Sequence, residues 1–342
     1  MRTLFLATAS LLVLSGGAYA SGDRDHGRRH HGPRAPQTVE DYYAAALAVN
    51  LGQVSGNESR TGRGESASVN MRGGFSGMRG VANVNQNAGA NSAQQNAVAV
   101  AYIEGCDCQV TVGSPRSRSS GDADANAVAG NGAQVVGNGS ANGEERHHGD
   151  RRHGGSGGGT EASVGMNGSF NNATGVVQVN QNAGANSGQQ NATSVVYVDG
   201  IRGQVQDRDA WAISANVGDV GGNRSRDAGH SASAGMTGAF TGFTGAASVN
   251  QNAGANSLQQ NATSLAAITY CNCATQDLST TIAAAGNFGG VARNYASASG
   301  GSATVTMANS FNGMTGVAQV SQNAGANSLM QNTIAVGAVY NR

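Results

Sequence analysis

Charge and aromatic side chains are scarce in this sequence. Charged residues make up 12% of the 342 positions and aromatic residues 5%, whereas 53 positions are glycine. Lysine is absent, so all 20 basic residues are arginine, and the formal net charge is zero. Ordinary globular domains have about twice this share of charged residues, so the composition does not fit one. A net charge near zero favours self-association over solubility.

The repeated part of the sequence also lacks the groups that catalysis needs. We find no nucleophile paired with a base, no phosphate-binding loop and no paired carboxylates in the repeats, and single Asp and Glu residues lie in the linkers. An enzyme built on a β-helix would be expected to gather carboxylates in a cleft, and none cluster here. We therefore expect no catalytic residues and no cofactor. The sequence indicates a structural or binding protein rather than an enzyme.

No apolar run is long enough to cross a bilayer as a helix. Residues 4–14 are apolar, but they follow the basic start Met1-Arg2-Thr3 and precede Ala18-Tyr19-Ala20, which fits an A-x-A cleavage site. This pattern is typical of a secretory signal peptide over residues 1–20, cleaved near Ala20. Residues 21–43 are then expected to form a flexible, disordered basic leader rich in Arg and His.

One seven-residue segment occurs four times and organises the chain. Its sequence is Gln-Asn-Ala-Gly-Ala-Asn-Ser, and its copies occupy residues 86–92, 181–187, 251–257 and 322–328. Each copy is followed, three residues after its Ser, by Gln-Asn. No copy contains a titratable side chain, so acid–base or metal chemistry is not expected of it. The amide side chains instead suit stacking, because each amide can both donate and accept a hydrogen bond.

The repeats also define the organisation of the chain. One Phe recurs in each unit, at Phe75, Phe170, Phe240 and Phe311, with spacings of 95, 70 and 71 residues. The basic period is therefore about 70 residues. We assign repeat unit one to residues 44–109, a linker to 110–124, unit two to 125–203, unit three to 204–276 and unit four to 277–342. Unit two carries an Arg- and His-rich insertion near residues 143–157, which is expected to lie in an outer loop.

Apolar residues alternate with polar or small residues in several short stretches. Ala67, Val69 and Met71 show this pattern, and equivalent triplets precede the Phe of every other unit. A period of two predicts a strand with one buried face, and the Phe is expected on that face if the strand continues. Another strand leads into the repeated segment, Gly89 predicts a bend, and a strand rich in Val, Ile, Ala and Thr follows. We expect four short strands per unit.

These strands predict an all-β fold, either a β-solenoid or a cross-β stack of the four imperfect units. One unit buries little by itself, whereas stacked units share a continuous narrow core. Like residues would lie above one another, and stacked amides would form ladders. The ladder residues expected are Gln86, Asn91, Gln181, Asn186, Gln251, Asn256, Gln322 and Asn327. The last unit has almost no cap, so further molecules are expected to add end to end.

The four cysteines are the only reactive constellation. Cys106-x-Cys108 and Cys271-x-Cys273 directly follow the last strand of units one and three. An even number of cysteines in an exported protein favours disulfides. A bond within one pair would be strained, which leaves bonds between the pairs or between molecules. Buried free thiols are the alternative, and the spacing disfavours a four-cysteine metal site.

Histidines cluster in the leader and in the insertion. They are His26, His30, His31, His147, His148 and His153. Such clusters could bind transition metals, but the interleaved Arg residues disfavour cations. The same segments could bind anionic polysaccharide or extracellular DNA. A solvated loop explains them almost as well, and we predict no metal site.

The signal peptide, the imperfect repeats rich in Asn, Gln, Ala and Gly and the variable linkers resemble those of the Fap fibre proteins. These proteins are bacterial functional amyloid subunits of biofilm matrices. The resemblance covers residues 44–342. Curli subunits are more distantly similar, because their Gln-x-Gly-x-x-Asn motif has a shorter period. Fap subunits carry a Cys-x-x-Cys near the C-terminus, whereas the last unit here has no cysteine.

The resemblance implies a secreted structural protein that self-assembles into extracellular, amyloid-like fibres of a biofilm matrix. Its partners would be further copies of itself, a related minor or nucleating subunit, and an outer-membrane export machinery. The alternative is a monomeric β-solenoid surface adhesin or glycan-binding module that uses the stack as a scaffold. An ice-binding face would need rows of Thr, and only scattered Thr residues are present.

Overall fold

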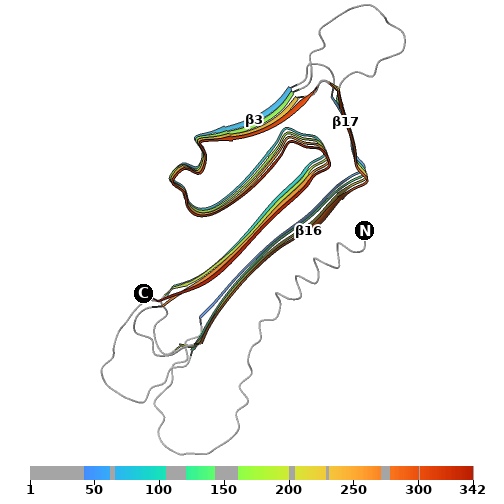
Figure 1. The fold of residues 1–342 in the computed structure, drawn as a ribbon. Coiled ribbons are helices and arrows are strands. Elements are labelled where there is room, and N and C mark those ends of the chain that lie inside the picture. Colours follow the sequence, from blue (N-terminus) through green and yellow to red (C-terminus); the bar gives the residue numbers. More distant parts are fainter. Residues whose placement is uncertain are drawn as a thin grey trace, which may run out of the picture.

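The structure, a computed structural model, describes residues 42–61, 66–104, 121–142, 161–199, 205–228, 231–270, 278–299 and 301–341. These residues form four stacked rungs of a β-solenoid, one rung for each repeat (Figure 1). Every rung contributes one strand to each of five sheets. The all-β repeat stack expected from the sequence is confirmed. Within the described part of the chain, no helix is long and apolar enough to cross a membrane.

The strands recur in the same order in every rung. Rung one contains β1 (Tyr42–Ser55), β2 (Glu58–Thr61), β3 (Ser66–Arg72), β4 (Arg79–Asn87) and β5 (Ala93–Glu104). Rung two contains β6 (Gly121–Val136), β7 (Gly139–Asn142), β8 (Glu161–Asn167), β9 (Thr174–Asn182) and β10 (Gly188–Asp199). Rung three contains β11 (Val205–Gly221), β12 (Arg224–Ala228), β13 (Ser231–Thr237), β14 (Thr244–Asn252) and β15 (Leu258–Tyr270). Rung four contains β16 (Leu278–Ala292), β17 (Tyr295–Ser299), β18 (Ser302–Ala308), β19 (Thr315–Asn323) and β20 (Leu329–Asn341).

Neighbouring strands are parallel, and equivalent residues pair from rung to rung. Gln86 of β4 lies beside Gln181 of β9, which lies beside Gln251 of β14. The residues of this column are 95, 70 and 71 positions apart in sequence. In the sheet of β1, the column of Asn50, Asn131, Asn216 and Asn287 has separations of 81, 85 and 71 residues. The extra residues therefore fall between strands, and the register within each sheet is kept, apart from one irregularity between Val205 and Asp207, at the start of β11.

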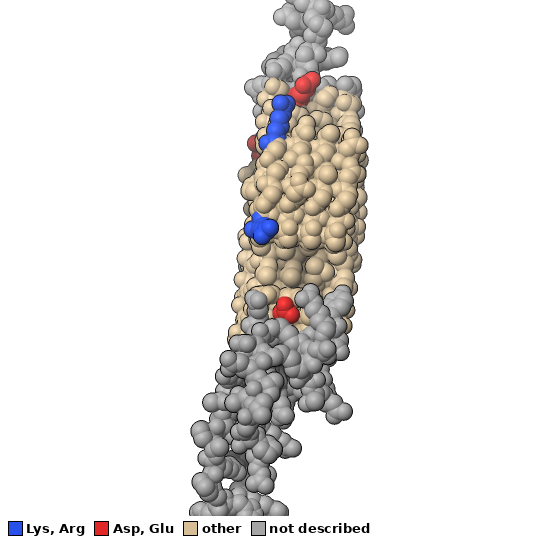
Figure 2. Space-filling view, turned by 90° about the vertical axis from the view of Figure 1, so that its left-hand side faces the viewer, with Lys and Arg blue, Asp and Glu red and all other residues tan. Residues whose placement is uncertain are grey.

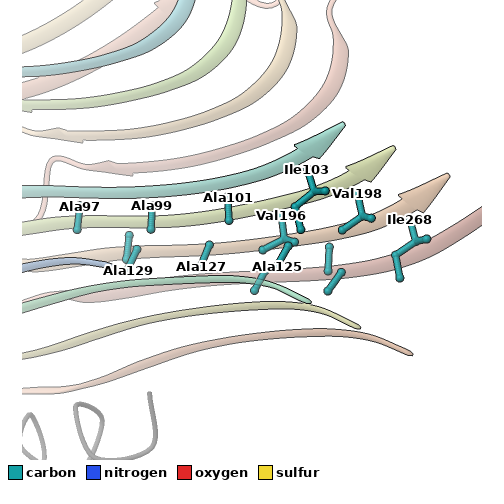
Figure 3. Close-up of a cluster of buried hydrophobic side chains, with 14 residues drawn as sticks. Ala97, Ala99, Ala101, Ile103, Ala125, Ala127, Ala129, Val196, Val198 and Ile268 are labelled. Carbon is teal, nitrogen blue, oxygen red and sulfur yellow. The ribbon is translucent and has the colours of Figure 1, made fainter. Parts of the chain in front are cut away.

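Each rung follows a serpentine path that packs its strands into layers (Figure 1). The β1 sheet lies against the β5 sheet, the β5 sheet against the β4 sheet, and the β4 sheet against the β3 sheet. The short β2 sheet connects the outer layers. Small side chains fill the first interface, where β5 and β6 face each other through Ala97, Ala99, Ala101, Ala125, Ala127 and Ala129 (Figure 3). Alanine lets these two layers approach closely and bury apolar surface.

Larger side chains fill the core between the β3 and β4 sheets. The ring of Phe240 is completely buried and stacks on Phe170 and Phe311, with centroids 5.0 Å and 4.7 Å away. Phe243 meets the same ring edge-on at 5.5 Å. Phe75 ends the column in rung one and is 46% exposed. The two inner rungs therefore carry the best-buried core, and the two end rungs are open on one side.

One expectation about a single unit is wrong, and the condition attached to another is not met. Each rung has five strands instead of four, and those of the β1 sheet are long, with 14 residues in β1 and 17 in β11. The strand before each Phe also stops too early to carry it, since β3 ends at Arg72. Phe75 instead lies in a bend with a φ of 60°. The bend, and not a continued strand, directs the equivalent Phe side chains into the core of the inner rungs.

Several sequence features lie outside the described residues. They are the signal peptide with its cleavage site, the leader up to residue 41, and the insertion near residues 143–157. Strands β1 and β6 begin at Tyr42 and Gly121, slightly before the first residues expected for units one and two.

The stacked Phe column predicts unequal effects of truncation. Phe240→Ala removes a completely buried ring with neighbours on both sides, so we expect the free energy of unfolding to fall by about 3–5 kcal/mol. Phe288→Ala is the control, because that ring is 61% exposed, and it should cost much less. Urea unfolding followed by circular dichroism measures both. Equal losses would show that the Phe column is not the principal core.

Candidate functional site in the amide ladders

The repeated seven-residue segment ends one strand and forms the bend before the next. In rung two, β9 ends at Asn182 and β10 begins at Gly188. Asn182 holds the bend, since its Oδ1 accepts a hydrogen bond from Gly184 N at 3.2 Å and its Nδ2 donates to Gly184 O at 2.8 Å. Asn186 has a φ of 52°, a conformation that Asn adopts more readily than most residues. The segment thus encodes a local bend as well as a stacking surface.

The first Gln of the segment forms a continuous ladder. Gln181 Nε2 donates to Gln86 Oε1 at 2.8 Å, Gln251 Nε2 to Gln181 Oε1 at 2.7 Å, and Gln322 Nε2 to Gln251 Oε1 at 2.7 Å. The side chains of Gln181 and Gln251 are completely buried. Gln322, in the last rung, is exposed. The structure therefore brings all four predicted Gln residues together.

The second Asn of the segment forms a ladder that runs the other way. Asn91 Nδ2 donates to Asn186 Oδ1, Asn186 to Asn256 and Asn256 to Asn327, each at 3.1 Å. The same amides also donate to backbone carbonyls of the β2 sheet, as Asn91 does to Gly139 O at 2.9 Å. This second bond ties the bend to a different sheet of the same stack.

Further ladders lie outside the predicted set. They are formed by Gln95, Gln190, Gln260 and Gln331, by Asn96, Asn191, Asn261 and Asn332, by Asn87, Asn182, Asn252 and Asn323, and by Asn50, Asn131, Asn216 and Asn287. The signal for each was present in the sequence, because the same amide recurs at the same place in all four units. Asn180 and Asn191 also bond across layers, at 2.8 Å, which joins neighbouring ladders.

The ladders fix the register of the stack. An amide hydrogen bond adds about 0.5–1.5 kcal/mol net, whereas a buried amide left without a partner costs about 1–3 kcal/mol. A one-residue shift between rungs would turn each side chain to the opposite face of its sheet. Completely buried amides such as Gln181 and Asn250 would then lose their partners. Stacking of identical residues is therefore strongly favoured over any shifted arrangement.

A family model supplies the comparison that fits this geometry. The functional amyloid protein FapB/FapC family matches residues 18–196 and 145–339, two overlapping segments that include strands of all four rungs. The chain belongs to this family. Fap proteins are functional amyloid, structural components of extracellular fibres. No curated protein and no solved structure gives a significant match.

Charged side chains are rare on this Fap-family stack. Figure 2 shows one side of it, where isolated Arg and acidic residues interrupt an otherwise uncharged surface. Among the described residues, no three His, Cys, Asp or Glu side chains come together as a metal site requires. The candidate disulfide residues Cys106, Cys108, Cys271 and Cys273, and the six clustered histidines, lie outside the described residues.

The Gln ladder predicts a pH-dependent defect in this Fap chain. Replacing Gln181 and Gln251 by Glu places two carboxyl groups in adjacent buried layers. Burial and like charge both raise the pKa of a carboxyl group. The loss of stability should therefore be full above that raised pKa and disappear as the pH falls below about 4.3, the value of an unfolded Glu.

Urea midpoints measured across this pH range test the ladder. Gln53→Glu is the control, because Gln53 is exposed in rung one, and its midpoint should change little with pH. The same pH profile for both variants would mean that Gln181 and Gln251 do not face each other in a buried ladder.

Proposed function

We propose that this chain is a secreted structural protein that assembles end to end into amyloid-like fibres of an extracellular biofilm matrix. The observation that carries the proposal is the pair of open ends. Strands β1 to β5 form one end of the stack and β16 to β20 the other, and each of these strands has a neighbour on one side only. Such edges present backbone N–H and C=O groups that pair readily with another chain.

The side chains of the end rungs also favour further stacking. Phe75 is 46% exposed, whereas the equivalent Phe170 and Phe240 are completely buried between rungs. A molecule stacked on rung one would cover Phe75 in the same way, and burying apolar surface contributes about 25 cal/mol per Å². Soluble solenoids usually end in polar capping repeats. Here the end rungs repeat the amides and the Phe of the inner ones.

Export and matrix partners belong to the same proposal. The signal peptide of residues 1–20 would direct secretion, with cleavage near Ala20. The resemblance to Fap proteins supports passage through an outer-membrane export machinery and nucleation by a related minor subunit. The Arg- and His-rich segments would attract anionic polysaccharide or extracellular DNA.

Self-assembly is the direct test of the proposed function. The chain without residues 1–20 should form filaments in dilute buffer, and fibre diffraction should give an axial repeat near 4.8 Å, the spacing of hydrogen-bonded strands. A monomer that stays monodisperse for days at high concentration would contradict the proposal.

The cysteines are proposed to link molecules or alternate rungs. Strands β5 and β15, which precede Cys106 and Cys271, lie on opposite sides of β10. Two layers of about 4.8 Å separate such strands by roughly 9.6 Å, more than the ~7 Å that a disulfide allows between Cα atoms. A direct bond between equivalent positions of the two rungs is therefore unfavourable in a straight stack.

Changing all four cysteines to Ser should leave fibre formation intact and lower the resistance of fibres to denaturant. The disulfides would lock an assembly that hydrogen bonds and packing already hold together. Electrophoresis with and without reductant, with mass mapping of linked peptides, measures the bonds. A bond confined to Cys106–Cys108, or a complete loss of assembly, would contradict this role.

A further inference from the structure

Gly89, Gly184, Gly254 and Gly325 form a column in which each rung except the last is in close contact with the next rung. A Cβ added to Gly184 would lie 1.9 Å from Gly254 O, and one added to Gly254 would lie 1.8 Å from Gly325 O. The backbones approach so closely that no side chain fits at these positions. A Cβ on Gly325, in rung four, meets nothing nearer than Asn323 Oδ1 at 3.5 Å. Its free space is the place that the next rung occupies inside the stack.

In a second glycine column, a Cβ added to each residue would face the preceding rung instead of the next one. A Cβ on Gly175 would lie 1.8 Å from Gly80 O, and one on Gly245 would lie 2.0 Å from Gly175 O. A Cβ on Gly80, in rung one, finds nothing within 4 Å. Rung one therefore has an open position toward its free side, as rung four has at Gly325. The two ends are complementary to each other.

Ser328, in rung four, is a second sign of a missing neighbour. Its Oγ is buried and has no hydrogen-bond partner. The equivalent Ser187 lies 3.4 Å from Gly254 O of the next rung and accepts from Asn252 Nδ2 of that rung at 2.8 Å, and Ser92 likewise accepts from Asn182 Nδ2 at 2.6 Å. Ser257 of rung three instead bonds Ser187 Oγ at 3.3 Å. Rung four has no next rung within the molecule, so Ser328 lacks both groups.

We propose that rung four of one molecule binds rung one of a second copy, in register and with parallel strands. Rung one of the second copy would then occupy the position of a fifth rung of the first molecule. We call this contact the joint. Gly325 would face Gly89 of the second copy, and Ser328 would bond Gly89 O and Asn87 Nδ2. The inference rests on the fibre assembly proposed above, and it identifies the partner surface as the opposite end of the same chain.

The ladders have the donors and acceptors that the joint needs. The Gln ladder donates toward rung one, so Gln86 would donate to Gln322 Oε1 of the neighbouring molecule. The Asn ladder donates toward rung four, so Asn327 would donate to Asn91 Oδ1 across the joint. These directions match only when unlike ends meet. The fibre is therefore polar.

One ladder is interrupted at the joint. Gln94 Nε2 donates to Gln189 Oε1 at 2.8 Å and Gln189 Nε2 to Gln259 Oε1 at 2.9 Å, but the fourth position is Met330, whose sulfur accepts from Gln259 at 3.8 Å. A thioether accepts weakly and cannot donate. Gln94 of the next molecule would thus lack the donor that the step between inner rungs provides. The joint therefore has one hydrogen bond fewer in this ladder than the contact between the two inner rungs.

Gly325→Ala separates the joint from the fold. The added methyl has space within the molecule, and Gly325 is not among the glycines with positive φ. Overpacking the joint should raise the critical concentration for assembly at least about tenfold, while circular dichroism and the urea midpoint stay unchanged. Gly290→Ala is the matched control in rung four, because its column carries side chains at Asp219, Gln134 and Gln53. It should assemble as the unmodified chain does.

Because unlike ends meet at the joint, Gly325→Ala can also be tested by its effect on the growth of fibres of the unmodified chain. Its rung one is intact, so it should bind the exposed rung four of a growing fibre and then block that end. Small amounts should slow seeded growth of the unmodified chain, and Gly290→Ala should not. Assembly of Gly325→Ala at the unmodified critical concentration would overturn the joint.

Met330→Gln tests the same joint without a steric change. The new amide would complete the ladder, and we expect the critical concentration to fall about five-fold. Met330→Leu, which adds no amide, should leave it unchanged. The fall in critical concentration caused by Met330→Gln should be smaller in a Gln94→Met background. Residues 94 and 330 lie in opposite end rungs, so they can interact only across the joint.

Equal gains in both backgrounds would overturn the joint and leave fibre formation standing. Absence of fibres from the unmodified chain and from every variant would overturn both the joint and the proposed function.

Discussion

The fold depends on one constraint, the hydrogen bonding of identical side-chain amides between rungs a single strand spacing apart. A Gln or Asn in such a column needs the same residue above and below it, at the same position and in the same rotamer. Gln181 meets this condition on both sides, through Gln86 and Gln251. Because these amides are buried, a shifted register would leave them without partners. The repeated sequence, the parallel sheets and the near absence of charge within the repeated segments all satisfy this constraint.

The sequence was sufficient to predict the stack but not the path of one rung. The alternation at Ala67, Val69 and Met71 and the four-fold recurrence of the Gln and Asn positions predicted strands and columns, and both are present. The long strand β1 was missed, although Ala44, Ala46 and Ala48 alternate toward the β5 sheet. Alanine is weakly apolar and a poor strand former, so its alternation gives a weak signal. The bend at Phe75 was missed although Gly73 and Gly77, both with positive φ, lie on either side of it. Glycine at such positions is a local turn signal, whereas the φ of 60° at Phe75 itself is uncommon for Phe.

The same constraint explains why the ends of the stack are reactive surfaces. A solenoid becomes a finished soluble protein when its last repeats exchange stacking residues for polar caps. Rung four keeps Phe311, Gln322, Asn327 and Gln331, and exposes amides that the inner rungs bury. Its departures from the pattern are small, with Ser321 in the Asn180 column and Met330 in the Gln189 column. Ser321 still bonds Asn261 Oδ1 and accepts from Asn332, so Met330 is the larger interruption.

Because the constraint acts on columns of stacked residues, it does not fix the length of the connections between strands. The Gln86 column has separations of 95, 70 and 71 residues, whereas the Asn50 column has 81, 85 and 71. Extra length thus enters after β5 and after β7, and every sheet still keeps its pairing. Loop closure adds only slowly to the free-energy cost as a loop lengthens. The segments that hold the cysteines and clustered histidines can therefore vary in length and charge without disturbing the ladders. Chemistry that acts on the surroundings can then be added without changing the columns of identical amides.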